Sequence, residues 1–220
     1  MEKKMKPSLK TEWFSVVTIL AALIIGWWAY PNLPDMVPSH WNIAGEVDGW
    51  STRLGHTLGI PATMLGVYLL FPLIRKIEPR KLHFEKSIGF YNLIRNFLMG
   101  FFLYIFVIAT WAGLSNEPVP MNTFIPFAIG ILFILLGNYM SQIKSNFFMG
   151  IRTPWTLSSD TVWQKTHLLG GYTFVIGGIL FVFTPFFPEP FNFYIPITGI
   201  LIAALVPIVY SYILYEQGKK

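Results

Sequence analysis

Residues 118–143 read PVPMNTFIPFAIGILFILLGNYMSQI and contain no Asp, Glu, Lys or Arg. A helix rises about 1.5 Å per residue, so a run of this length crosses the roughly 30 Å of hydrocarbon in a bilayer. Comparable uncharged runs cover residues 13–30, 57–74, 96–116, 168–188 and 190–215. The pattern predicts an all-α, polytopic membrane protein with six transmembrane helices.

The composition of the chain excludes an ordinary soluble domain. Of its 220 residues, 54% are hydrophobic and only 12% are charged, whereas soluble domains carry about 25% charged residues. The chain has no cysteine, which excludes disulfides and thiolate metal sites. We expect no cofactor.

The basic residues gather in alternate connections between these runs. All Lys and Arg except Arg53 and Arg95 lie at the two ends of the chain, in residues 75–86 or in residues 144–165. By the positive-inside rule, these segments and both termini are cytoplasmic, and an even number of spans agrees with the six runs. The Lys and Arg of residues 75–87 are read as anchors for lipid head groups. The net charge of +5 therefore indicates the lipid bilayer as partner and no direct contact with nucleic acid.

The N-terminus combines a basic head with an apolar run, as a signal peptide does. The run ends at AYPNLP, residues 29–34, without a small-x-small cleavage site. We expect an uncleaved first helix.

The chain divides into two regions. Residues 1–75 are expected to form a helical hairpin with an external loop at 31–56, and residues 76–220 a four-helix region with a cytoplasmic loop at 144–167. The prolines of the external loop end the first helix, and its glycines suit turns. We expect this loop to be compact and partly laid on the membrane.

The external loop holds His40, Glu46 and Asp48, with Asp35 nearby, the one group in the chain with metal-ligand character. The spacing is not that of a zinc site, and no metal is expected. The preferred interpretation is that His40 and Asn42 cap turns, Gly45 permits a turn and Trp41 packs. The acidic residues then give the outer face a negative charge that suits a cationic peptide.

Polar residues within the spans allow two interpretations. Asn92, Arg95 and Asn96 share one helix face. They indicate either hydrogen bonds between helices with Arg95 snorkelling, or a polar cavity open to the cytoplasm. Asn138 is expected to be buried and to bond to a neighbouring helix. No Asp or Glu lies deep in a span, which argues against a proton-coupled carrier.

The cytoplasmic loop is rich in structural signals. Gly150 permits a tight turn, and Pro154 holds Thr153 extended. Thr156, Ser158 or Ser159 is suited to cap a helix that begins near Asp160 and continues into the fifth span.

Two interpretations of that helix start remain open. In one, Trp163 is buried at the interface and Lys165 faces the head groups. In the other, Arg152, Lys165 and His167 donate hydrogen bonds to an anionic or polar partner, with Trp155 stacked on Arg152. A hydrolase is not expected, since the G-x-S-x-G elbow is absent and the Ser and Asp residues suit caps.

Two segments carry a resemblance to a known family. Residues 137–172, GNYMSQIKSNFFMGIRTPWTLSSDTVWQKTHLLGGY, resemble the signature of the SdpI family of bacterial membrane immunity proteins. Residues 30–50, YPNLPDMVPSHWNIAGEVDGW, resemble the uncharacterised domain that often precedes it. The matching positions are Asn138, Lys144, Asn146, Gly150, Arg152, Thr153, Pro154, Trp155, Thr156, Leu157, Trp163, Lys165, Thr166 and His167.

The resemblance implies a multi-pass protein of the bacterial cell membrane that protects its cell from a secreted toxin peptide. In the best-known case it also implies signalling, by holding a transcriptional repressor at the membrane. It implies no enzyme activity. The alternative from the polar residues in the spans is a small transporter or channel.

Overall fold

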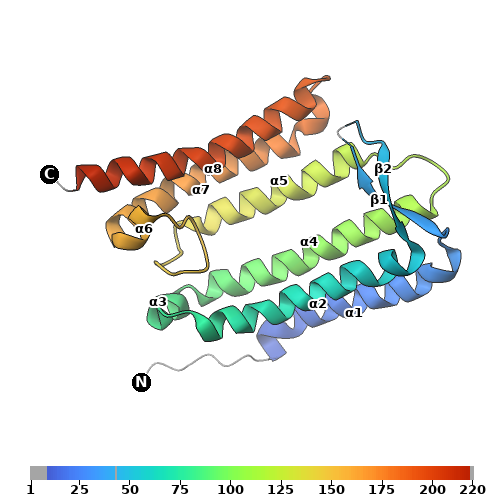
Figure 1. Cartoon of the computed structure of the whole chain (residues 1–220), viewed down its shortest axis with the longest axis horizontal. Helices are drawn as coiled ribbons and strands as arrows, with labels where there is room; N and C mark the ends of the chain where they lie inside the picture. The colour runs from blue at the N-terminus through green and yellow to red at the C-terminus, as the bar shows by residue number, and fades with distance from the viewer. Residues whose placement is uncertain (1–8, 43, 219–220) are drawn as a thin grey trace. The chain divides into compact units, whose positions relative to one another are not determined.

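The computed structural model describes residues 9–42 and 44–218 (Figure 1). The basic residues Lys3, Lys4, Lys6, Lys219 and Lys220 lie outside the described residues, as does the side chain of Lys10. The elements are α1 (Leu9–Ala29), η1 (Tyr30–Asn32), β1 (Met36–Trp41), β2 (Val47–Thr52), α2 (Arg53–Ile77), α3 (Lys81–Lys86), α4 (Ile88–Leu114), α5 (Met121–Met140), α6 (Pro154–Ser158), α7 (Asp160–Val182), η2 (Thr184–Phe186) and α8 (Phe191–Gln217).

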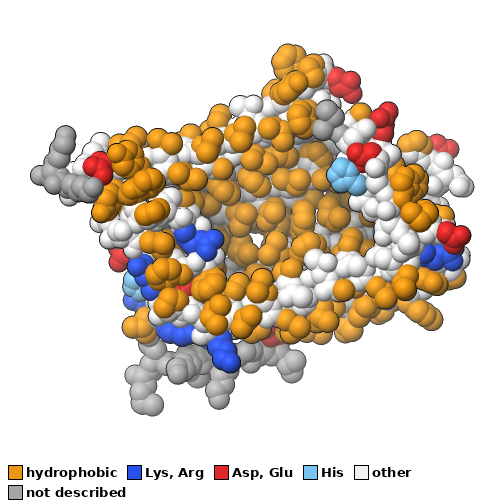
Figure 2. All heavy atoms as spheres, viewed as in Figure 1, with side chains coloured by type: hydrophobic (Ala, Val, Ile, Leu, Met, Phe, Trp, Pro, Cys, Tyr) orange, Lys and Arg blue, Asp and Glu red, His pale blue; other side chains and the backbone are white. Residues whose placement is uncertain are grey.

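Six helices of the described chain are long and apolar enough to cross a membrane, namely α1, α2, α4, α5, α7 and α8. This confirms the six spans predicted from the sequence. Their outward side chains are largely apolar, as the hydrophobic colouring in Figure 2 shows. Trp27 of α1 is 81% exposed and Leu54 of α2 is 56% exposed, as expected of surfaces that face lipid.

Several helices extend beyond the uncharged runs. The second begins at Arg53 and the third at Ile88, because a helix continues through residues whose charged ends project beyond the hydrocarbon. Arg95 consequently lies inside α4.

A two-stranded antiparallel sheet stands in the loop between α1 and α2, which the sequence did not predict. Its register pairs Met36 with Thr52 and Trp41 with Val47, with irregularities on either side of His40. Gly49 permits the close pairing, since a Cβ there would lie 2.8 Å from the His40 Cβ. The strands are short and β1 contains Pro38, so their pattern differs from that of a regular strand. We call residues 36–52 the β-hairpin.

The chain divides into two compact units. The first comprises the described residues up to 72 together with 92–121, and the second comprises residues 73–91 together with 122–218. In the first, Ala22, Met64, Met99 and Phe106 form a buried core. The β-hairpin joins this unit through Val37, which clusters with Ala29, Leu33 and Leu114. The sequence division at residue 75 stays a prediction.

In the second unit, glycines bring α5 and α7 into backbone contact. A Cβ on Gly130 would lie 2.6 Å from the Gly178 carbonyl oxygen, and one on Gly137 would lie 2.6 Å from that of Gly171. Small residues permit such approaches between helices in membranes. Residues 141–153, which we call the 141–153 loop, connect the end of this helix pair to α6.

Candidate functional site

The 141–153 loop is shaped from within by Asn146, which is fully buried. Its amide nitrogen donates to the carbonyl oxygens of Lys144 at 2.8 Å and Met149 at 3.2 Å. Its amide oxygen accepts from the backbone N–H groups of Phe148 at 2.9 Å and Met149 at 2.6 Å. One side chain thus satisfies four backbone groups that no regular element would pair. Asn146 therefore fixes the conformation of this loop, which lies within the signature at residues 137–172.

A second tight contact joins Gly150 of this loop to His167 of α7. Gly150 has a φ of 95°, and a Cβ there would lie 2.2 Å from His167 Nε2. His167 is fully buried; its Nε2 accepts from the backbone N–H of Ile151 at 2.9 Å, so its Nδ1 donates to the Trp163 carbonyl at 2.8 Å. The predicted turn at Gly150 is confirmed. Of the two interpretations left open by the sequence, the one in which His167 donates to a partner does not hold, since both ring nitrogens bond inside the protein.

Trp163 closes the loop from α7. Its ring stacks on His167 at a centroid distance of 4.0 Å, because residues four apart share a helix face. The Trp163 side chain is 1% exposed, and its Nε1 donates to the Ile143 carbonyl at 2.7 Å. Trp163 is buried, as one interpretation predicted, but within the protein instead of at its surface. Lys165 is exposed.

Of the three cap candidates, Ser159 caps α7, whereas Thr156 and Ser158 lie in α6, a short helix that the sequence did not predict. Thr153 is extended, with φ −115° and ψ 163°, and forms a capping box with Thr156 at the start of α6. Ser159 caps α7 by accepting from the Val162 N–H at 3.3 Å. The Thr153 hydroxyl also lies 3.1 Å from that of Ser211 in α8. The segment is thereby joined to the last helix of the unit.

Glu78 is the main residue that sequence reasoning missed. It lies between α2 and α3 and is fully buried. One carboxylate oxygen accepts from the Arg80 N–H at 2.8 Å and the other from the Phe147 N–H at 3.0 Å. The same connection contains a second acid, Glu85, and no local pattern distinguishes Glu78 from it. Its partner in the 141–153 loop is distant in sequence.

Arg80 continues this connection, which corrects its predicted role as a head-group anchor. Its guanidinium donates to the Ser145 hydroxyl and, at 2.9 Å, to the Leu157 carbonyl. It also lies 5.0 Å from the centre of the Phe147 ring. Arg80 thus ties the segment before α3 to the 141–153 loop and to α6.

The outward face of the motif carries few of the predicted residues. Arg152 and Lys144 are exposed, and the Arg152 guanidinium donates to the Phe147 carbonyl at 2.6 Å. Figure 2 shows Lys and Arg side chains near α3 and α6. Trp155 packs on Tyr212 of α8, with ring centroids 5.0 Å apart. Asn138 is exposed, so the prediction that it is buried is wrong.

The β-hairpin holds the predicted external residues. The Asn42 side-chain oxygen accepts from the N–H groups of Ala44 at 2.9 Å and Glu46 at 3.0 Å, which confirms Asn42 as a turn cap. Gly45 has a φ of 80°, as a turn glycine should. His40 does not cap a turn, because its Nδ1 lies 2.5 Å from Asp48 Oδ1 across the strands.

Two further residues of the predicted external loop lie in or beside the β-hairpin. Asp35 pairs with Arg53 at 2.8 Å, and Trp41 is half-buried. In the described part of the chain, no three His, Cys, Asp or Glu residues are grouped closely enough to hold a metal ion.

Arg95 and Asn96 bind α1 within the first unit. The Arg95 guanidinium lies 2.7 Å from a Glu12 carboxylate oxygen, and the Asn96 side chain accepts from the Ser15 hydroxyl at 2.9 Å. Arg95 is 3% exposed, so it is paired inside the protein and does not snorkel. These contacts support the helix–helix interpretation of this polar face.

Comparisons with known proteins match both ends of the chain. Residues 142–211 match the SdpI/YfhL protein family, and residues 17–65 match a domain of unknown function, DUF1648. The chain is 26% identical over 209 residues to "Immunity protein SdpI" of Bacillus subtilis (strain 168), which covers 95% of this chain and 98% of that protein. No solved structure matches. The resemblance predicted from the sequence is confirmed, and with six spans it indicates a multi-pass protein of the bacterial cell membrane.

Proposed function

We propose that this chain, which carries an SdpI/YfhL region and resembles an immunity protein and not an enzyme, protects its cell against a secreted antimicrobial peptide. The observation that carries the proposal is the match to an immunity protein along 95% of the chain. The matched region 142–211 includes the caps, Asn146, Gly150 and His167 that build the motif.

The two polar regions suit different roles in such a protein. In the proposed topology the β-hairpin lies outside, where a secreted peptide arrives, and exposes Glu46 and Asp48 to a cationic partner. The 141–153 loop lies in the cytoplasm. There the exposed Arg152 and Lys165 would hold a transcriptional repressor at the membrane, because guanidinium and ammonium groups bind carboxylates.

Survival of a toxin-sensitive strain tests the protective role. Expression of the chain should raise survival during exposure to a panel of related toxin peptides, whereas a strain with the empty vector dies. Glu46→Gln in the β-hairpin should lower survival, with Glu117→Gln as a matched control at another exposed acid. Both variants should reach the membrane in equal amounts. Unchanged killing across the panel would contradict the proposal.

The transporter alternative makes a separate prediction. Vesicles that contain the purified chain should then accumulate or release small solutes faster than empty vesicles. Intact protection together with no solute movement would remove this alternative. Movement without protection would replace the immunity proposal.

A further inference from the structure

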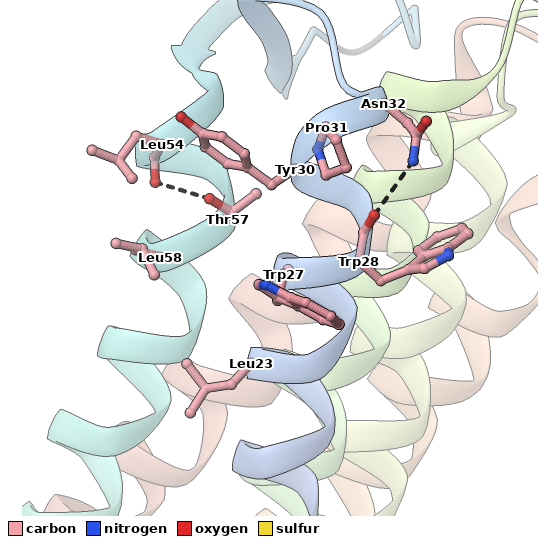
Figure 3. Close-up of a pocket in the computed structure, with 10 residues that line it drawn as sticks. Leu23, Trp27, Trp28, Tyr30, Pro31, Asn32, Leu54, Thr57 and Leu58 are labelled. Atoms are coloured by element: carbon pink, nitrogen blue, oxygen red, sulfur yellow. Dashed lines mark hydrogen bonds between the residues drawn. The ribbon is translucent and has the colours of Figure 1, made fainter.

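An apolar groove of about 750 Å³ lies between α1 and α2, next to the β-hairpin in the first unit. Figure 3 shows Leu23 and Trp27 of α1 on one side and Leu54 and Leu58 of α2 on the other. This volume is in the range of about 300–1,000 Å³ typical of sites for small molecules.

The floor of the groove is closed by a direct approach of the two helices. A Cβ on Gly26 would lie 2.8 Å from the Thr57 carbonyl oxygen, so little space remains beneath the groove. Above this floor, Trp27 is 81% exposed and Leu58 is 51% exposed. Both residues belong to membrane-spanning segments. Hydrocarbon is therefore the medium that meets the groove.

One end of the groove is polar. Tyr30 lines it, and the Arg53 guanidinium lies 5.6 Å from the centre of the Tyr30 ring. The same guanidinium donates to Asp35 at 2.8 Å, and the Asp35 side chain is 98% exposed. A cation and an anion thus stand together at the rim. Asn32, which also lines the groove, adds an amide.

We propose that this groove binds one phospholipid with a zwitterionic, amine-bearing head group of the phosphatidylethanolamine type. An acyl chain lies between Trp27 and Leu58 and gains packing contacts with an aromatic ring. The head-group phosphate meets Arg53, and its ammonium meets Asp35. The apolar groove leads to a charged rim, just as the acyl chain of the lipid leads to its charged head group. This inference goes beyond toxin protection and does not depend on it.

Lipid retention by the purified full chain tests the acyl-chain part. The protein is reconstituted in vesicles of equal parts dioleoyl phosphatidylethanolamine and dioleoyl phosphatidylglycerol, then extracted, and its bound lipids are identified by native mass spectrometry. Leu58→Trp fills the groove and should reduce retained lipid about tenfold, equivalent to about 1.4 kcal/mol. Leu205→Trp is the matched control, since Leu205 is 55% exposed on α8 and outside the groove.

Head-group selectivity tests the rim. The wild-type chain should retain phosphatidylethanolamine over phosphatidylglycerol. Asp35→Asn should reverse this preference, because Arg53 is left as an unpaired cation that favours an anionic lipid. Because the Asp35 side chain is exposed, Asp35→Asn should fold as the wild type does. Equal thermal stability of the variant and the wild type checks this point. Equal retention by the two Trp variants, no retained lipid in the wild type, or a head-group preference unaffected by Asp35→Asn would each overturn the proposal.

Discussion

The 141–153 loop and the β-hairpin both lie between membrane-spanning helices, but the polar side chains at their centres differ in burial. In the loop, Asn146 and the neighbouring His167 are fully buried and bonded to backbone groups. In the β-hairpin, His40 and Asp48 remain 72% and 45% exposed while they contact each other. The difference shows that conspicuous polar residues in a sequence can serve to fold a loop. The polar residues of the β-hairpin, by contrast, remain accessible to a partner.

The largest expected effect comes from Gly150→Ala. The new Cβ would meet His167 Nε2 at 2.2 Å, and the φ of 95° strains any residue with a side chain. We expect a loss of about 3 kcal/mol or more in the free energy of unfolding. Thermal unfolding in detergent measures it. Gly59→Ala in α2 is the control, because a Cβ there meets nothing within 4 Å. Equal stability of the two variants would show that the loop is not fixed as described.

A somewhat smaller effect is expected for Glu78→Ala. The change leaves the N–H groups of Arg80 and Phe147 without their carboxylate acceptor, at a cost of about 2–3 kcal/mol. Limited proteolysis should then cut the 141–153 loop faster. Glu117→Ala, at an exposed acid, should leave both stability and cleavage unchanged. Cleavage of Glu78→Ala at the wild-type rate would show that Glu78 does not hold the 141–153 loop in place.

The smallest effect on stability is expected for Asp48→Asn in the β-hairpin. The His40–Asp48 contact is largely exposed, so the change should alter the free energy of unfolding by no more than about 0.5 kcal/mol. Protection against a cationic toxin should nevertheless fall, because a surface charge is lost. Survival assays and thermal unfolding of the same variant measure the two effects. A stable variant with full protection would remove Asp48 from the proposed contact.

Sequence reasoning worked where a local pattern determines the structure. The spans follow from runs without charges, the Asn42 turn from its own side chain and the start of α7 from Ser159. It failed where the outcome depends on distant neighbours. The bond between Glu78 and Phe147 joins residues 69 positions apart, and no pattern within either segment indicates it.

The errors at single residues have the same origin. His167 is a residue type that commonly donates hydrogen bonds at a surface. It is buried here because the 141–153 loop folds over it. The paired strands escaped prediction because Pro38 and the irregular register around His40 break the regular alternation of a strand. The groove at Trp27 requires two helices to be placed side by side.

The backbone contact between α5 and α7 has a mechanical consequence. Where Gly130 meets Gly178 and Gly137 meets Gly171, backbone approaches backbone directly, which leaves little room for the two helices to move against each other. We therefore expect α5 and α7 to tilt or rotate as one rigid body, together with the 141–153 loop that follows α5. A displacement of the end of this helix pair opposite the 141–153 loop would change the orientation of the loop. The packing inside the loop would stay the same.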